Sequence, residues 1–146
     1  MRKSTIRFVG VIGVVSSLVG CFGNEVVDLS KEQLVEVMQL QGKNIGCYYY
    51  GEYSSDLGTP IMGLEHRNYA DRFTSILTQW ANQHGKDTSK ITSIDAALKS
   101  AMLQDIETAK RKGISLTQSK EFKEGIGDCR EVRFASKRLF ARLGME

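Results

Sequence analysis

Apolar side chains in this chain recur three and four residues apart, and no stretch alternates between apolar and polar residues with period two. Such spacing is typical of the buried face of a helix, whereas a half-buried strand buries every second residue. Four segments of this kind follow residue 30, with breaks near residues 54–60, 85–90 and 113. Amphipathic helices joined by short connections pack as antiparallel bundles. The sequence therefore predicts an all-α fold, a small four-helix up-down bundle over residues 30–146.

Capping signals place the helix ends. Ser30 with Gln33 three residues later forms a capping-box pattern, so the first helix should begin there. Thr92 with Asp95 predicts the N-terminus of the third helix, and three cations before Gly113 predict its end. The second and fourth helices should cover about residues 61–83 and 117–143, and Gly125 and Gly127 could bend or break the fourth. The third helix carries its apolar stripe at Ile94, Ala97, Leu98, Ala101, Met102, Ile106 and Ala109.

The N-terminus has the layout of a secretory signal. A basic segment at Met1–Arg7 precedes an apolar run at Phe8–Val19 and a small residue before Cys21. The apolar run is too short to span a hydrocarbon core, which takes about 20 residues. We therefore expect residues 1–20 to be a cleaved signal peptide.

The last four residues of that signal, Leu18-Val19-Gly20-Cys21, resemble the lipobox of bacterial lipoproteins. The resemblance implies cleavage before Cys21, acyl chains such as palmitate on Cys21, and residues 21–29 as a tether. Phe22 stands where an aspartate commonly signals retention in the inner membrane, so the implied location is the periplasmic face of the outer membrane. The alternative is cleavage by ordinary signal peptidase, which would leave a soluble periplasmic protein.

Three cysteines leave one unpaired in any disulfide framework. If Cys21 carries lipid, Cys47 and Cys129 remain, and an oxidising periplasm permits a disulfide between them. In an antiparallel pairing of the first and last helices their heights match. The alternative is two buried free thiols that behave as small apolar side chains.

The net charge of +3 belongs to the signal, because Arg2, Lys3 and Arg7 are its only charged residues. Without them the 20 basic and 17 acidic residues of the chain become 17 of each, so composition gives no support for nucleic-acid binding. Acidic residues predominate in residues 21–65 and basic ones in 130–142, and an antiparallel fold could lay these segments side by side.

No catalytic motif is present. The chain has no HExxH, nucleophile elbow or phosphate loop, and His66 and His84 are too far apart for a recognised ligand pair. His66 fits a structural or surface role. We expect no enzymatic activity, no metal site and no cofactor beyond the lipid on Cys21.

Two groups of residues are candidates for binding a partner. Adjacent helix positions point about 100° apart, so the tyrosines of residues 48–53 cannot all face one core. The basic residues near the C-terminus are spaced three and four apart and share one side of a helix. The alternatives are packing of the rings around the cysteine pair and a solvated basic face. The candidates are Tyr48, Tyr50, Tyr53, Arg130, Arg133 and Lys137.

The lipobox and the pair Cys47/Cys129 resemble the plan of the pilot lipoproteins of type II secretion. That resemblance implies a protein partner, a secretin segment held in a helical groove and carried to the outer membrane. The segment from Cys129 to Leu139 is also similar to the C-terminal run of immunity proteins against type VI secreted amidases, with spacing one residue longer. Those proteins often lack a lipid anchor. A structural envelope lipoprotein is the third alternative.

Overall fold

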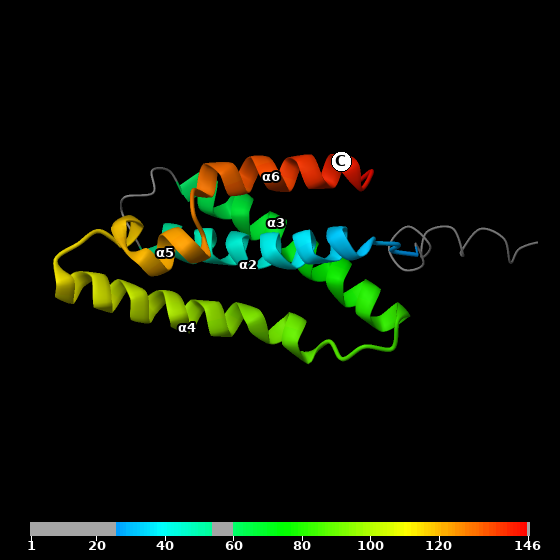
Figure 1. Cartoon of the computed structure of the whole chain (residues 1–146), viewed down its shortest axis with the longest axis horizontal. Coiled ribbons are helices and arrows are strands. Elements are labelled where there is room, and N and C mark those ends of the chain that lie inside the picture. Colours follow the sequence, from blue (N-terminus) through cyan, green and yellow to red (C-terminus); the bar gives the residue numbers. More distant parts are fainter. Residues whose placement is uncertain (1–25, 54–59, 146) are drawn as a thin grey trace, which may run out of the picture.

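The computed structural model describes residues 26–53 and 60–145, and every regular element within them is a helix. Successive long helices run in opposite directions, and α2 lies between α4 on one side and α6 on the other (Figure 1). This is the expected up-down bundle, with two short elements added before the last helix. The elements are α2 (Lys31–Tyr53), α3 (Pro60–Gln83), α4 (Ser89–Lys112), the 3-10 helix η1 (Leu116–Gln118), α5 (Lys120–Gly125) and α6 (Cys129–Arg142).

Two of the expected helix ends are confirmed. The Gln33 backbone N–H donates to Ser30 Oγ at 3.1 Å, and the Ser30 N–H donates to Gln33 Oε1 at 2.9 Å, which is a reciprocal capping box. At the C-terminus of α4, Gly113 adopts φ 65°, a left-handed conformation that favours glycine. Local sequence therefore decides where α2 begins and α4 ends.

The expected start of α4 at Thr92 is wrong. The helix begins at Ser89, and the Thr92 hydroxyl instead bonds within the first turn to the Thr88 carbonyl. Asp87 accepts hydrogen bonds from both the backbone N–H and the hydroxyl of Ser89, at 2.9 and 2.6 Å. Asp87 thus stabilises an earlier first turn.

The expected last helix over residues 117–143, which Gly125 and Gly127 could bend or break, is divided into η1, α5 and α6. Gly127 at φ 76° turns the chain between the last two. Each new helix has its own cap, since Ser119 Oγ accepts from the Phe122 N–H and Asp128 Oδ1 accepts from the Arg130 N–H. The chain reverses at the glycines, and α6 then returns along α2 and α3.

The core centres on α2, α3 and α6. A disulfide joins Cys47 of α2 to Cys129 of α6, as expected for the first and last helices, with a Cα–Cα distance of 5.8 Å. The Phe140 ring of α6 stacks on Phe73 of α3 with centroids 4.5 Å apart. The largest fully buried apolar side chains are Tyr50, Phe73, Leu77, Leu139 and Val37.

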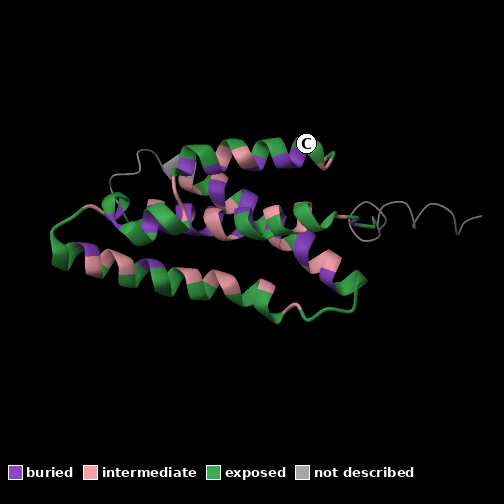
Figure 2. Cartoon of the chain, viewed as in Figure 1, coloured by how far each residue is buried: buried purple, intermediate pink, exposed green. Residues whose placement is uncertain are grey.

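By contrast, α4 is poorly covered. Nine of the 23 residues of α2 are buried, but only Met102 and Ala109 are buried among the 24 of α4. Figure 2 shows this helix exposed along most of its length. Ala97 and Ala101, which the apolar stripe of α4 includes, are exposed. The helix therefore carries an apolar face that the described part of the chain only partly buries.

Candidate functional site

A groove of about 310 Å³ opens where α4 lies beside α2, and α5 closes one end of it. One wall is the α4 face that includes Leu98, Ala101 and Met102. Met38, at 54% exposure, lines the opposite wall on α2, and the Phe122 side chain lies at the closed end. Most of these lining side chains are apolar, so the groove offers an apolar surface to a ligand.

Small residues on α2 form the floor of the groove. Gly42 and Gly46 are four residues apart and so share one face of the helix. A Cβ at position 46 would overlap the Ile126 side chain, and one at position 42 would lie 3.8 Å from Leu98 Cδ1. Gly46 thus lets the Ile126 side chain rest directly on the backbone of α2, whereas a Cβ at position 42 would make only an ordinary van der Waals contact.

The groove has an acidic rim. Asp105 of α4 and Glu121 of α5 both line it, and no ion pair of either carboxylate is found in the described residues. Burial, and then the nearby Glu121 carboxylate, raise the pKa of Asp105. Lys43 of α2 also lines the groove, but no ion pair between it and either carboxylate is found in the described residues. Two close carboxylates without a paired cation favour a ligand that brings a positive charge.

The candidate tyrosines differ in exposure. Tyr50 is 2% exposed and packs on Phe122, with ring centroids 4.8 Å apart, so its ring is not on the surface. Tyr48 is half-buried beneath the Arg67 guanidinium, 5.3 Å from the ring centroid. Only Tyr53, at 42% exposure, presents its ring to solvent.

Two of the three candidate cations are already paired. Arg133 and Lys137 lie 3.3 and 3.5 Å from the Glu65 carboxylate of α3. Arg142 likewise pairs with Glu36 of α2. These ion pairs bring the acidic and basic segments of the sequence side by side, whereas the exposed Arg130 has no ion pair within the described residues.

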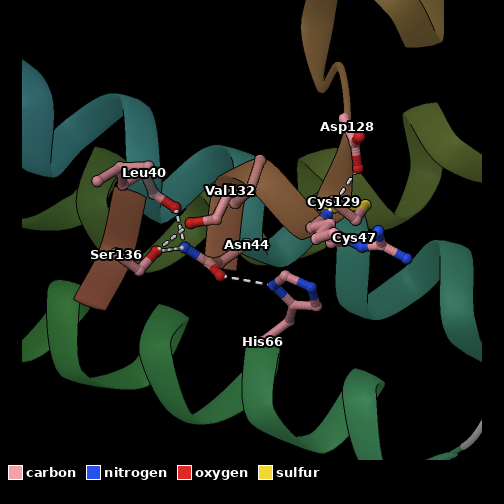
Figure 3. The surroundings of a disulfide bond; sticks show 9 residues. Leu40, Asn44, Cys47, His66, Asp128, Cys129, Val132 and Ser136 are labelled. Carbon is pink, nitrogen blue, oxygen red and sulfur yellow. Dashed lines mark hydrogen bonds between the residues drawn. A yellow bond between two sulfur atoms is a disulfide. The ribbon is translucent and has the colours of Figure 1, made fainter. Parts of the chain in front are cut away.

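Next to the disulfide lies a buried polar network (Figure 3). Asn44 Nδ2 donates to the Leu40 carbonyl at 2.7 Å and to Ser136 Oγ at 2.8 Å, and Asn44 Oδ1 lies 2.7 Å from His66 Nδ1. His66 is 1% exposed, and its Nε2 has no hydrogen-bond partner. Burial lowers the pKa of His66, so the ring is neutral at pH 7.

Neither the groove between α2 and α4 nor the buried polar network around His66 was predicted from the sequence. Glycine disfavours the interior of a helix, so Gly42 and Gly46 weaken the prediction of α2, yet their spacing of four indicates a shared face without side chains. His66 was expected to have a structural or a surface role, and at 1% exposure it is not on the surface. Nothing in the sequence indicates that Asn44 faces it from 22 residues away.

Cys21, the expected lipid site, and the signal that precedes it lie outside the described residues. Within the part that is described, no helix is long and apolar enough to cross a membrane. The chain matches no protein-family model, and no curated protein or solved structure shows significant similarity to it. The site must therefore be interpreted from its own geometry.

Proposed function

We propose that this chain is a lipid-anchored, non-catalytic binding protein of the bacterial envelope, which holds a helical segment of a partner protein in the groove between α2, α4 and α5. The groove carries the proposal, because an apolar trough beside an under-covered helix is the kind of surface into which an amphipathic helix docks. The lipobox-like Leu18–Cys21 supports the anchor.

The acidic rim specifies the partner further. A segment whose apolar stripe contacts Leu98 and Met38 would place a flanking Lys or Arg near Asp105 and Glu121. Pairing there would relieve the repulsion between the two carboxylates. The proposed partner is therefore an amphipathic helix with a basic residue beside its apolar stripe.

Site-specific photocrosslinking in living cells tests the groove. A photoreactive residue at Ala101, which lines the groove, should crosslink the partner, and the same residue at Ala96 should not. Both alanines are exposed on α4, but they are five positions apart and point about 140° apart around the helix. The crosslinked peptide must be an amphipathic segment with a basic residue. Equal crosslinking at both positions, or a peptide of other chemistry, contradicts the proposal.

Function is tested with the matched pair Ala101→Glu and Ala96→Glu. Each variant gene is introduced into a strain from which the wild-type gene is deleted. Ala101→Glu puts a third carboxylate in the groove and should fail to restore the wild-type phenotype, whereas Ala96→Glu should restore it. For a pilot role, deletion leaves a secretin at the inner membrane and Cys21→Ser has the same effect. Toxin sensitivity that Cys21→Ser still suppresses would instead establish an immunity protein.

A further inference from the structure

Three groups with metal-ligand chemistry converge behind the groove-bearing face of α2. Cys47 of α2, His66 of α3 and Cys129 of α6 offer ligand atoms that all lie within 4.8 Å of one another, and all three residues are buried. In the structure the two sulfurs are bonded to each other. As drawn in Figure 3, the imidazole lies between Asn44 and this disulfide.

Hydrogen bonding fixes which nitrogen of His66 is free. The Asn44 Nδ2 group donates to the Leu40 carbonyl and to Ser136 Oγ. Turning the amide around would set its oxygen against the Leu40 carbonyl, so Oδ1 faces the histidine as an acceptor. His66 Nδ1 must then carry the proton and donate at 2.7 Å. Nε2 is left with a lone pair.

That lone pair has no partner in the structure, although His66 is 1% exposed. A buried acceptor without a hydrogen bond loses its hydration without compensation, so its retention calls for an explanation. A histidine that donates from one nitrogen to a fixed oxygen, and presents the other as a lone pair, is oriented as metal-ligating histidines are.

We propose that reduction of the Cys47–Cys129 disulfide converts this cluster into a site for one thiophilic cation of the Zn²⁺ class. A dithiol reductant supplies two electrons and two protons, which gives two cysteine thiols and the oxidised dithiol. Zn²⁺ then displaces both thiol protons and binds the two thiolates and His66 Nε2. Water completes a tetrahedral set, because the described residues add no fourth ligand.

The consequence is a redox gate that is independent of the groove. In the oxidised chain the sulfurs are used by the disulfide and no cation binds. In the reduced chain one cation bridges α2, α3 and α6, and so replaces the crosslink between α2 and α6. The site would form only in newly made or reductively stressed protein.

Zinc titration of the reduced full chain tests this, with Cys21→Ala so that Cys47 and Cys129 are the only thiols. With a phosphine as reductant, we expect one Zn²⁺ per chain and two protons released per Zn²⁺. Co²⁺ should give a thiolate charge-transfer band under the same conditions. The oxidised chain should bind neither ion. A reduced chain that takes up no stoichiometric Zn²⁺, or an oxidised chain that does, would overturn the proposal.

Variants distinguish ligation from incidental thiol binding. His66→Phe should weaken Zn²⁺ binding more than the roughly 10–100-fold loss seen on removing outer-shell partners, while the matched change of the exposed His84, His84→Phe, should leave it unchanged. Cys47→Ser with Cys129→Ser should abolish binding. If reduction lowers the helical circular dichroism, Zn²⁺ must restore it. Unrestored helicity, or equal affinity in His66→Phe and the parent chain, contradicts the inference.

Discussion

Removal of the Cys47–Cys129 crosslink should cost this protein about 4.5 kcal/mol of stability. The disulfide joins residues 82 apart in the sequence. For a loop of that length the chain-entropy relation gives about 15 cal/mol/K, or about 4.5 kcal/mol at 25 °C. Because single domains are stable by roughly 5–15 kcal/mol, this is a large share of the total.

Urea unfolding measures the loss and its cause together. Two samples lack the crosslink: the double variant Cys47→Ala, Cys129→Ala, and the reduced wild-type chain, which keeps both sulfur atoms. With a slope of about 2 kcal/mol per molar urea, both midpoints should fall by about 2 M. The slope itself should rise, because an unfolded chain without the crosslink exposes more surface. These titrations are run with a chelator so that no metal occupies the reduced site.

The reasoning would be refuted by a loss below about 1 kcal/mol with an unchanged slope. That result would mean that the oxidised unfolded chain is no more restricted than the reduced one. A large loss in the alanine variant but not in the reduced wild-type chain would also count against it, since packing of the sulfur atoms would then be the cause.

Three further changes have defined outcomes in the same unfolding assay. Ser30→Ala breaks the reciprocal capping box with Gln33 and should cost about 1 kcal/mol, and an unchanged stability would mean that the box does not stabilise α2. Phe140→Ala removes a buried ring, 3% exposed, that stacks on Phe73, and should cost about 3–5 kcal/mol; a cost under 1 kcal/mol would mean that the ring is not packed. The oxidised protein should lose stability as the pH falls below 6.5, by at most about 1.4 kcal/mol per pH unit, because unfolded histidine takes up a proton there while burial lowers the pKa of folded His66. His66→Phe should flatten that part of the pH profile, and an unchanged profile would exclude His66 as its source.

The helices could be predicted because they depend on the local spacing of apolar residues. The Cys47–Cys129 disulfide could be predicted because two cysteines remain once Cys21 is assigned to the lipid. Apolar spacing marks each long helix, and the capping box at Ser30 and the glycine at Gly113 act within a single turn. The start of α4 was misplaced because two overlapping caps compete there. Asp87 binds Ser89 through two hydrogen bonds, and Thr92 alone could not reveal that.

The groove could not be predicted because it forms where the apolar face of α4 is left partly uncovered by the other helices. The apolar stripe of α4 is visible in the sequence, but the exposure of Ala101 follows from how α4 is placed against α2. Likewise, the polar residues Asn44 and Ser136 lie 92 positions apart, and only the return of α6 along α2 brings them together.

The disulfide joins α2 to α6, whereas the groove lies between α2, α4 and α5. This arrangement predicts unequal stability within the bundle. The crosslink and the stacked Phe73 and Phe140 rings tie α2, α3 and α6 together, whereas α4 contributes only Met102 and Ala109 to the buried set. Helices with few buried contacts open locally at lower free energy. Amide hydrogen exchange should therefore be faster in the middle of α4 than in the middle of α2, and a partner helix bound in the groove should slow exchange in α4 far more than in α6. If α4 exchanges as slowly as α2 in the free protein, the wall of the groove is already fully stabilised, and the argument that α4 lacks a covering partner fails.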